Sequence, residues 1–248
     1  MIGDKPPVAA PAATLILLRP ALRGFEVLLL LRASEINFAG ANWVFPGGRI
    51  EITDSPGGDP SSLAAARNAA ARECSEEAGL DLATESMIYY SHWTTPTSYK
   101  KRFATWFLLD HLGDTQAVRI DGKEIVDYRW LPPARALQLQ AVGQLKMMPP
   151  TYLTLLELAQ CPSIDSAREF ALARDIPVIL PLEISQGDQR WMLYPEDAAY
   201  STGNPDAPGR RRRIVFESGK NWRYENSDPV LFTEPETLPG LPGLSDPA

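Results

Sequence analysis

The order of strands and helices along the chain predicts an α/β fold, with α+β as the closely related description. Apolar runs of strand length stand before and after one long alanine-rich helix, and a second helix follows the last run. An order of strands, helix, strands and helix is typical of a domain in which helices cover a sheet. The sequence therefore predicts one layered domain over residues 13–143.

The expected strands of this domain are short and rich in apolar or β-branched residues. They are TLILLRP (14–20), FEVLLLLR (25–32), WVF (43–45), SMIYYSHW (86–93), RFATWFLLD (102–110) and EIVDYRWL (124–131). A turn at Arg23 and Gly24 joins the first two strands, and residues 46–59 are expected to form a long loop.

The long helix has clear signals at both ends. Asp59 is expected to cap it, Pro60 suits its first position, and residues 61–78 are mostly strong helix formers. Gly79 is expected to end it. A second helix, PARALQLQ (133–140), begins with a proline.

Residues 144–228 are expected to form an extension of mixed helices and strands. The expected elements are helices at 147–160 and 165–174, strands at 176–185 and 189–195, and a hairpin at 211–226 that turns at Gly219 and Lys220. Residues 1–12 are expected to be a flexible tail, and the Pro- and Gly-rich residues 229–248 a disordered one.

Charge and composition narrow the classes of function. The net charge of −7 argues against nucleic-acid binding, and the arginine run at 210–213 is interpreted as local charge balance. The longest apolar runs, such as residues 27–31, are too short to span a membrane. Cys74 and Cys161 make neither a disulfide framework nor a zinc site. With no visible signal peptide, we expect a cytoplasmic protein that binds no membrane.

Three glutamates gather near the end of the long helix. Glu73, Glu76 and Glu77 are three or four residues apart and point into one sector, whereas core-like positions such as Cys74 lie opposite. A solvated acidic stripe has the same pattern. Two features favour a bound cation instead: the helix dipole disfavours negative charge at this end, and a Gly-Gly loop precedes the helix. Mg²⁺ or Mn²⁺ prefers such oxygen ligands.

Residues 45–80 resemble the Nudix box, in which Gly, five residues, Glu and seven residues precede R-E-U-x-E-E-x-G-U, where U is aliphatic. RECSEEAGL (72–80) matches the second part and FPGG (45–48) the usual entry, so that the box spans residues 48–80. Asp54 stands in the position of the first Glu, and about ten residues are inserted before Arg72. A competing register starts at Gly58 and puts Ala64 in the Glu position. We favour Gly48, because only that register follows the FPGG strand end.

An interrupted box with Asp in that position resembles the RP2-type or peroxisomal coenzyme A diphosphatase-like branch of the Nudix hydrolases. The resemblance includes HWTTP and KRFATWF after the box and covers residues 13–160. It implies the Nudix fold, an α/β/α sandwich with a mixed sheet. Ala104 replaces an Asp that the branch usually has. The coenzyme A motif before the box fits loosely, with Arg32 present and Asn37 where a second basic residue is often found.

The resemblance also implies roles for the residues of the box. The expected ligands of Mg²⁺ or Mn²⁺ are Glu73, Glu77, Glu76 and the carbonyl of Gly47 or Gly48. Glu76 could instead orient the attacking water, and Arg72 would hold the glutamates in place. Asp54 and Glu51 are expected to support them from the second layer.

Residues outside the box complete the expected site. Glu124 is the expected further ligand or general base, with Asp121 and Asp127 as alternates. Expected phosphate contacts are Arg32, Arg102, Lys100 and Lys101, and the residues that could stack on a base are Phe103, Trp93 and Trp106. We interpret His92 and His111 as structural.

Such enzymes hydrolyse a pyrophosphate bond in a nucleoside diphosphate linked to another moiety. The resemblance implies coenzyme A or acyl-coenzyme A as substrate. The alternatives are a pyrophosphatase of ADP-ribose, NADH or another nucleotide, and a nucleotide-binding module without turnover. An isoprenoid diphosphate isomerase is disfavoured, because neither Cys74 nor Cys161 is suitably placed. A homodimer is left open.

Overall fold

The computed structural model describes residues 6–33, 42–113, 116–120, 122–217 and 222–227. Its strands are β1 (Ala10–Pro20), β2 (Phe25–Arg32), β3 (Trp43–Val44), β4 (Gly47–Arg49), β5 (Ile88–Thr94), β6 (Phe103–His111), β7 (Ile125–Leu131), β8 (Val178–Ile179), β9 (Leu182–Gln186), β10 (Gln189–Leu193), β11 (Arg212–Glu217) and β12 (Arg223–Asn226). Its helices are α1 (Leu63–Ala78), α2 (Pro133–Ala141), α3 (Pro149–Leu158), α4 (Ile164–Leu172) and the 3₁₀ helix η2 (Ile52–Asp54).

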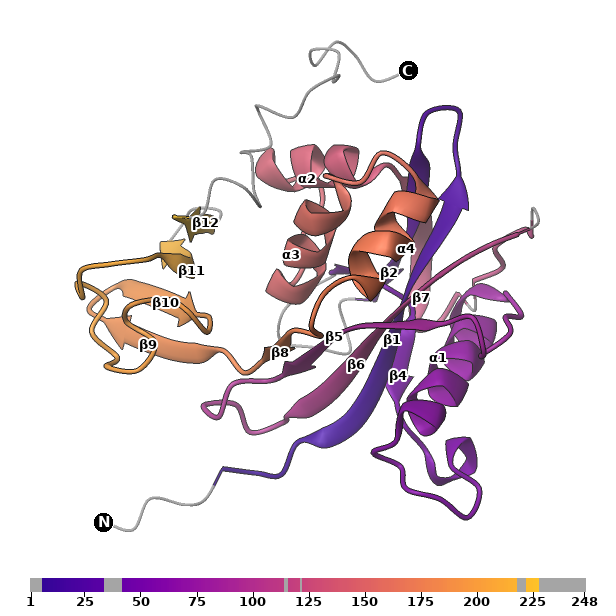
Figure 1. Cartoon of the computed structure of the whole chain (residues 1–248), viewed down its shortest axis with the longest axis horizontal. Helices are drawn as coiled ribbons and strands as arrows, with labels where there is room; N and C mark the ends of the chain where they lie inside the picture. The colour runs from indigo at the N-terminus through magenta and orange to yellow at the C-terminus, as the bar shows by residue number, and fades with distance from the viewer. Residues whose placement is uncertain (1–5, 34–41, 114–115, 121, 218–221, 228–248) are drawn as a thin grey trace.

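A mixed sheet of eight strands forms the centre of the described part of the chain. The strand order is β3-β2-β1-β6-β5-β8, and β4 pairs with β1 while β7 pairs with β2. β1 runs parallel to β6, and β5 runs parallel to β8. Helix α1 covers one face, and α2, α3 and α4 cover the other (Figure 1). The expected α/β/α sandwich with a mixed sheet is confirmed.

Alternation along β1 shows how the sequence separates two cores. Ile16 and Leu18 belong to the core beneath α2, α3 and α4, whereas Leu15 and Leu17 belong to the core beneath α1. All four side chains are fully buried. Successive strand residues point to opposite faces, so an apolar run without alternation predicts a strand that is covered on both sides.

Helix α1 begins later than the sequence predicted. Its N-cap is Ser62, whose hydroxyl accepts a hydrogen bond from the N–H of Ala65. Asp59, the expected cap, instead accepts a hydrogen bond from the N–H of Ser61 in the loop before the helix. The expected end is correct, since Gly79 adopts a left-handed φ of 65°.

Two segments that were expected to be irregular are strands. β1 begins at Ala10, so residues 10–12 of the expected tail belong to it, because they pair with residues 103–105 of β6. The expected loop of residues 46–59 contains β4, whose residues 47–49 pair with residues 12–14 of β1. Both segments are strands because they pair with strands that are distant in the sequence, and a local sequence pattern does not reveal such pairing.

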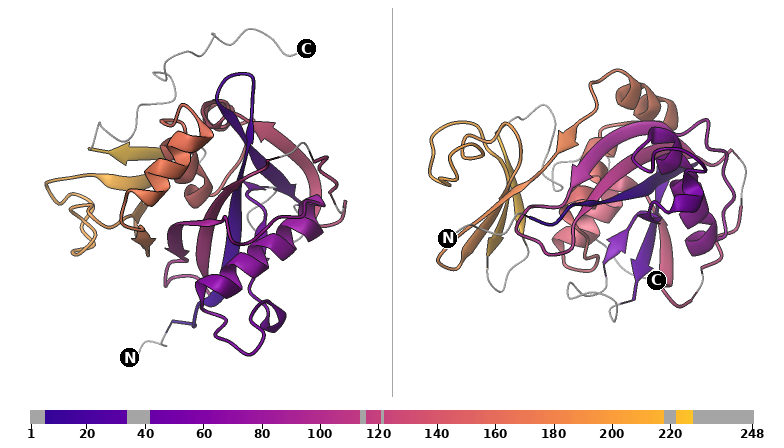
Figure 2. Two further views of the ribbon diagram at one scale, coloured as in Figure 1. Left: turned by 45° about the vertical axis from the view of Figure 1, so that its right-hand side comes forward. Right: turned by 90° about the horizontal axis from the view of Figure 1, so that it is seen from below.

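The C-terminal part packs directly on the central sheet. Helix α3 contributes Tyr152, Leu153, Leu155, Leu156 and Leu158 to the larger core. β8 extends the sheet beside β5, and a second sheet of order β12-β11-β10-β9 follows. Figure 2 shows this second sheet beside the helices that cover the central sheet. The expected turn at Gly219 and Lys220 and the expected tail of residues 229–248 lie outside the described residues.

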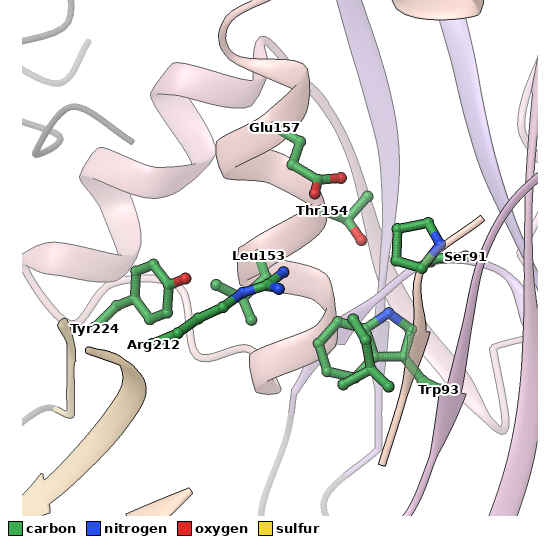
Figure 3. A pocket seen from close by; sticks show the side chains of 9 residues that line it. Ser91, Trp93, Leu153, Thr154, Glu157, Arg212 and Tyr224 are labelled. Carbon is green, nitrogen blue, oxygen red and sulfur yellow. The ribbon is translucent and has the colours of Figure 1, made fainter. Parts of the chain in front are cut away.

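A small cavity of about 10 Å³ lies where the second sheet meets α3 and β5. Ser91, Thr154, Glu157 and Arg212 are among the residues that line it (Figure 3). This volume holds about one water molecule, so the junction is closely packed. None of the described helices combines the length and the apolar character that a membrane span needs.

Candidate active site

Two adjacent glycines bring the backbone of β4 against helix α1. Gly47 and Gly48 pair with Thr14 and Ala13 of β1. Gly47 has a φ of 152°, and a Cβ there would lie 2.6 Å from the Cα of Thr14. A Cβ on Gly48 would overlap the carboxylate of Glu73. Only glycine fits at either position, and it leaves the β4 backbone in contact with the carboxylate.

Glu77 lies on the buried side of α1 and not on a solvent-exposed acidic stripe. Its side chain has only 5% of its surface exposed. The N–H of Gly47 donates a 2.8 Å hydrogen bond to its Oε2. The expected separation of acidic and buried faces is therefore wrong for Glu77, whereas Cys74 is buried as expected. The sequence held the signal, because Glu77 follows buried Cys74 by three residues on the same helix.

Arg72 connects the glutamates to the loop before the helix. Its Nε and Nη2 donate to the two carboxylate oxygens of Asp54 at 3.0 and 2.9 Å, and Nη2 also donates to the carbonyl of Arg49. Its Nη1 donates to Glu73 at 2.9 Å and to Glu76 at 3.2 Å. Arg72 was expected to hold the glutamates and Asp54 to support the site, and the two-bond contact between Arg72 and Asp54 joins these two roles.

Asp54 is a buried carboxylate in a position that fixes the loop geometry. Its Oδ2 accepts the N–H of Glu51, and its own carbonyl accepts a hydrogen bond from the side chain of Asn68. Burial raises the pKa of Asp54, but the hydrogen bonds from Arg72 and Glu51 outweigh this and hold the pKa below its ordinary value. Asp54 is thus an ionised partner of Arg72.

These contacts support Gly48 as the first glycine of the box. In that register Asp54 takes the Glu position and pairs with Arg72, and Gly48 touches Glu73. A Cβ on Gly58 would meet only Ser55 within 4 Å. Residues 56–61, which make up most of the insertion, form an exposed loop. A surface loop accepts such added length at little cost.

Glu73 and Glu76 differ in their surroundings. The Glu73 side chain is 16% exposed, and that of Glu76 is 60% exposed. Burial raises the pKa of Glu73 above its ordinary value, although the guanidiniums of Arg72 and Arg32 oppose this rise. A nearby divalent cation would favour the ionised form of Glu73.

Arg32 and Glu124 lie together beside the box. They form an ion pair, and the N–H of Ala33 donates to the carbonyl of Glu124 at 3.0 Å. Because Arg32 also acts electrostatically on Glu73, the pair extends the charged cluster beyond α1. The two residues expected for substrate binding and for base catalysis therefore contact each other.

Of the two alternates for Glu124, the structure describes only Asp127. Asp127 lies in β7 with about half of its side chain exposed, and its ion-pair partner is Arg129 at 3.9 Å. Asp121 lies outside the described residues.

Arg102 and Phe103 are not brought to the glutamate cluster. Arg102 donates to the carbonyls of Thr95 and Pro7 at 3.1 and 2.7 Å. It therefore ties the segment before β1 to the loop between β5 and β6. Phe103 lies at the start of β6, where the ammonium of Lys101 is 5.3 Å from its ring centroid. The exposed Lys100 and Lys101 belong to the same loop.

The other expected stacking residues lie in packed surroundings. Trp93 is buried against Phe107 and Tyr194. Trp106 lies 4.5 Å from the ring of Tyr89. His92 lies next to both, with its ring 5.1 Å from that of Trp106 and its Nδ1 3.1 Å from the hydroxyl of Tyr89.

The donor set at the cluster suits a divalent cation. Glu73, Glu76, Glu77 and the carbonyl of Gly48 offer oxygen atoms, which Mg²⁺ and Mn²⁺ prefer. Two of the three carboxylates have little exposure, and burying negative charge is costly without a cation. In the described part of the chain no three His, Cys, Asp or Glu side chains converge on one point. Glu73 faces Arg72, and Glu77 faces the N–H of Gly47.

Comparison with protein-family models gives a match to the NUDIX domain over residues 9–150, which is more than half of the chain. The matched range begins just before β1 and ends in the first turn of α3. The resemblance that FPGG and RECSEEAGL indicated is thereby confirmed.

Two curated relatives carry similar sequences. Nudix hydrolase 7 of Caenorhabditis elegans is 25% identical over 194 residues, which cover 64% of this chain and 63% of the relative. Acyl-coenzyme A diphosphatase NUDT19 of Xenopus laevis is 26% identical over 148 residues, 51% of this chain and 35% of the relative. The chain thus spans less than two thirds of the length of either relative.

A solved structure has a similar fold. The crystal structure of a NUDIX hydrolase from Alicyclobacillus acidocaldarius aligns with a TM-score of 0.58 and 23% identity, over 64% of this chain and 95% of that one. This likeness concerns the fold of the central domain.

Proposed function

We propose, from the premise that this chain belongs to the Nudix family, that it is a pyrophosphohydrolase dependent on a divalent metal ion. Its substrate would be a nucleoside diphosphate linked to another moiety, and water would attack one phosphorus of the pyrophosphate. The cytoplasmic location remains a prediction, and a homodimer remains open.

This proposal rests on the close contact between Gly48 and Glu73. Arg72, bound to Asp54, and the buried Glu77 lie on either side of this contact. A solvated acidic stripe requires neither a glycine under a glutamate nor a buried glutamate. Both features are expected where carboxylates are held in fixed positions for a ligand.

The glutamate cluster would hold the metal ion. Glu73 and Glu77 would be ligands together with the carbonyl of Gly48, and the exposed Glu76 would be a third ligand or would orient the water. Binding would require Glu73 and Glu77 to give up part of their contacts with Arg72 and Gly47. A bound Mg²⁺ or Mn²⁺ neutralises phosphate oxygens and makes water a better nucleophile.

Arg32 and Glu124 would act at the substrate side of the cluster. A phosphate group of the substrate would compete with Glu124 for the Arg32 guanidinium, because phosphate offers several charged acceptors. With phosphate in its place at Arg32, the Glu124 carboxylate could accept a proton from the attacking water. Glu124 is therefore our proposed general base, and Arg32 our proposed phosphate contact.

Coenzyme A or an acyl-coenzyme A is the proposed substrate. The interrupted box and the 26% identity to an acyl-coenzyme A diphosphatase support this choice. Arg102 and Phe103 remain proposed substrate contacts, and Arg102 would then exchange its hydrogen bonds to the carbonyls of Thr95 and Pro7 for bonds to the substrate.

The test is product analysis by chromatography and mass spectrometry. The protein would be incubated with coenzyme A, acetyl-coenzyme A, ADP-ribose, NADH and a dinucleoside polyphosphate, each with Mg²⁺, with Mn²⁺ and with a chelator. We expect adenosine 3′,5′-diphosphate and phosphopantetheine from coenzyme A, and no product with the chelator. If AMP is formed from ADP-ribose or NADH and coenzyme A is not cleaved, the proposed reaction stands but the proposed substrate is wrong.

We expect Glu77→Gln to abolish turnover while the fold is retained, because an amide is a poor ligand for the metal ion. Glu169→Gln is the matched control, since Glu169 is an exposed glutamate on α4. Circular dichroism would check the fold of both variants. Full turnover by Glu77→Gln would contradict the assignment of the site.

A further inference from the structure

A second pocket lies at the edge of the central sheet, next to the first residues of β5. Its volume is about 440 Å³, and it is lined by residues of α1, β5, α4 and the segments that flank them. β8 pairs with His92 and Trp93, and no described strand pairs with this edge of β5 before them. The volume falls within the range of small-molecule pockets.

Arg168 of α4 contributes a guanidinium to the lining of this pocket. Its side chain is only 28% exposed, and its Nη1 is a buried donor without a hydrogen-bond partner in the described part of the chain. The nearest carboxylate oxygen, of Asp110, lies 3.5 Å from Nη1. Asp110 already accepts the hydroxyl of Ser86 at 2.6 Å and the N–H of His111 at 2.8 Å. Nη1 therefore faces Asp110, and any anion in the pocket would meet the other nitrogens of this guanidinium, which donate no hydrogen bond within the described part of the chain.

Arg67 reaches the same pocket from α1. Its Nε and Nη2 both donate to the carbonyl of Met87, which leaves its positive charge without a carboxylate partner among the described residues. Arg174 also lines the pocket, but its charge is paired with Glu157 at 3.0 Å. Two guanidiniums from different helices thus line this pocket, Arg67 without a described ion pair and Arg168 with a 3.5 Å one to Asp110, and Glu85 is an acidic residue of the lining.

The remaining walls of the pocket are largely apolar. Tyr89 offers an aromatic ring, and Leu172, another lining residue, is 68% exposed. β1 and β6 lie between β4, which carries Gly48, and β5, which borders the pocket. The pocket is therefore distinct from the glutamate cluster.

We propose that this pocket binds a small organic monophosphate. Its phosphate would pair with Arg168 and Arg67, and its ring or apolar part would pack against Tyr89 and Leu172. A phosphate has three terminal oxygens, so it can accept hydrogen bonds from two guanidiniums that approach from separate elements. The aromatic and apolar walls favour an organic ligand over a bare ion.

The test is isothermal titration with AMP and with inorganic phosphate. The Glu77→Gln protein would be used with a chelator, so that neither turnover nor metal contributes and the result is independent of the proposed reaction. We expect AMP to bind at one site, and Arg168→Gln or Arg67→Gln, each added to Glu77→Gln, to weaken it about ten-fold or more. Arg135→Gln, an exposed arginine of α2, is the matched control and should change nothing.

Hydrogen exchange would locate the ligand, with protection by AMP expected at residues 85–90 and 164–176. Inorganic phosphate is expected to bind at least several-fold more weakly than AMP, and equally tight binding would overturn the organic part of the proposal. Binding that neither arginine variant changes, or no binding of AMP, would overturn the site. Circular dichroism and thermal unfolding would show that both variants remain folded.

Discussion

Gly48 lies so close to the Glu73 carboxylate that one added methyl group has no room. We expect Gly48→Ala to displace Glu73 and to lower kcat/KM by about 100-fold or more, since a misplacement of about 1 Å at a reacting group costs this much. Gly58→Ala is the control, because its Cβ would meet only the Ser55 hydroxyl at 3.2 Å. Steady-state kinetics would measure both. Normal activity of Gly48→Ala with impaired Gly58→Ala would favour the competing register.

Asp54 is the partner through which Arg72 holds the loop and the glutamates together. We expect Asp54→Asn to lower the free energy of unfolding by about 1.5–3 kcal/mol, the usual contribution of hydrogen bonds to a charged group. Activity should fall as well, because Arg72 then loses its anchor beside Glu73. Urea unfolding at neutral pH would measure the first effect. Asp59→Asn, at an exposed loop position, should stay within about 0.5 kcal/mol.

The sequence predicted which residues form the cluster but not what each side chain contacts. Arg72 and the three glutamates lie near one another because they share helix α1, where residues three or four apart are neighbours. The Arg32–Glu124 ion pair joins the end of β2 to the residue before β7, which is distant in the sequence, and no local pattern indicates it. Arg102 was expected at a phosphate but binds backbone carbonyls, which are present at every residue and leave no signal in the sequence.

At the scale of elements, the second sheet depends on a buried ion pair. Arg213 donates to both carboxylate oxygens of Asp197 at 2.8 and 2.6 Å, and both side chains are almost fully buried. We expect Asp197→Asn to lower the free energy of unfolding by about 3–5 kcal/mol, because it leaves Arg213 buried without its anion. Glu196→Gln is the control, since Glu196 is 53% exposed and lies 3.4 Å from its arginine partners. An equal effect of both variants would contradict this reasoning.

The same pair predicts a loss of stability in acid. Burial raises the pKa of Asp197, but hydrogen bonds from Arg213 and from the N–H groups of Arg212 and Ala199 hold the pKa below its ordinary value of 3.8. A carboxyl group with a lowered pKa in the folded state contributes its full stability above the unfolded pKa. That contribution is lost as the pH falls through the folded pKa. Urea unfolding above and below about pH 4 should therefore show an acid loss that Asp197→Asn reduces.

Most strands and helices were predictable because apolar runs and proline or glycine signals mark them locally. The structure differs from the prediction where pairing with a residue distant in the sequence determines the secondary structure. Residues 10–12 and 47–49 are strands because they pair with β6 and β1, although neither segment has a strand-like sequence. Helix α1 starts at Leu63 because Ser62 provides the cap, although Asp59 and Pro60 carry equally good local signals.

At the scale of the whole molecule, the packing of α3 bears on where the folded unit ends. The sequence predicted a domain ending at residue 143, and the family match ends at residue 150. The larger core nevertheless includes residues of α3, α4 and β8, as well as Met192, Tyr194 and Ile214 near or within the second sheet. The central sheet therefore uses the C-terminal part as the cover of one face.

This packing predicts that a chain ending at residue 143 does not fold cooperatively. It would lose Tyr152, Leu153, Leu155, Leu156 and Leu158, five buried side chains of α3. Each contributes about 1.5 kcal/mol or more, and the net stability of a domain is only about 5–15 kcal/mol. We expect broad, non-cooperative thermal unfolding and binding of a hydrophobic dye, whereas a chain ending at residue 227 should unfold in one sharp transition. A sharp transition of the shorter chain would mean that the helices of the extension are dispensable, and that the site in β4 and α1 depends on the first 143 residues alone.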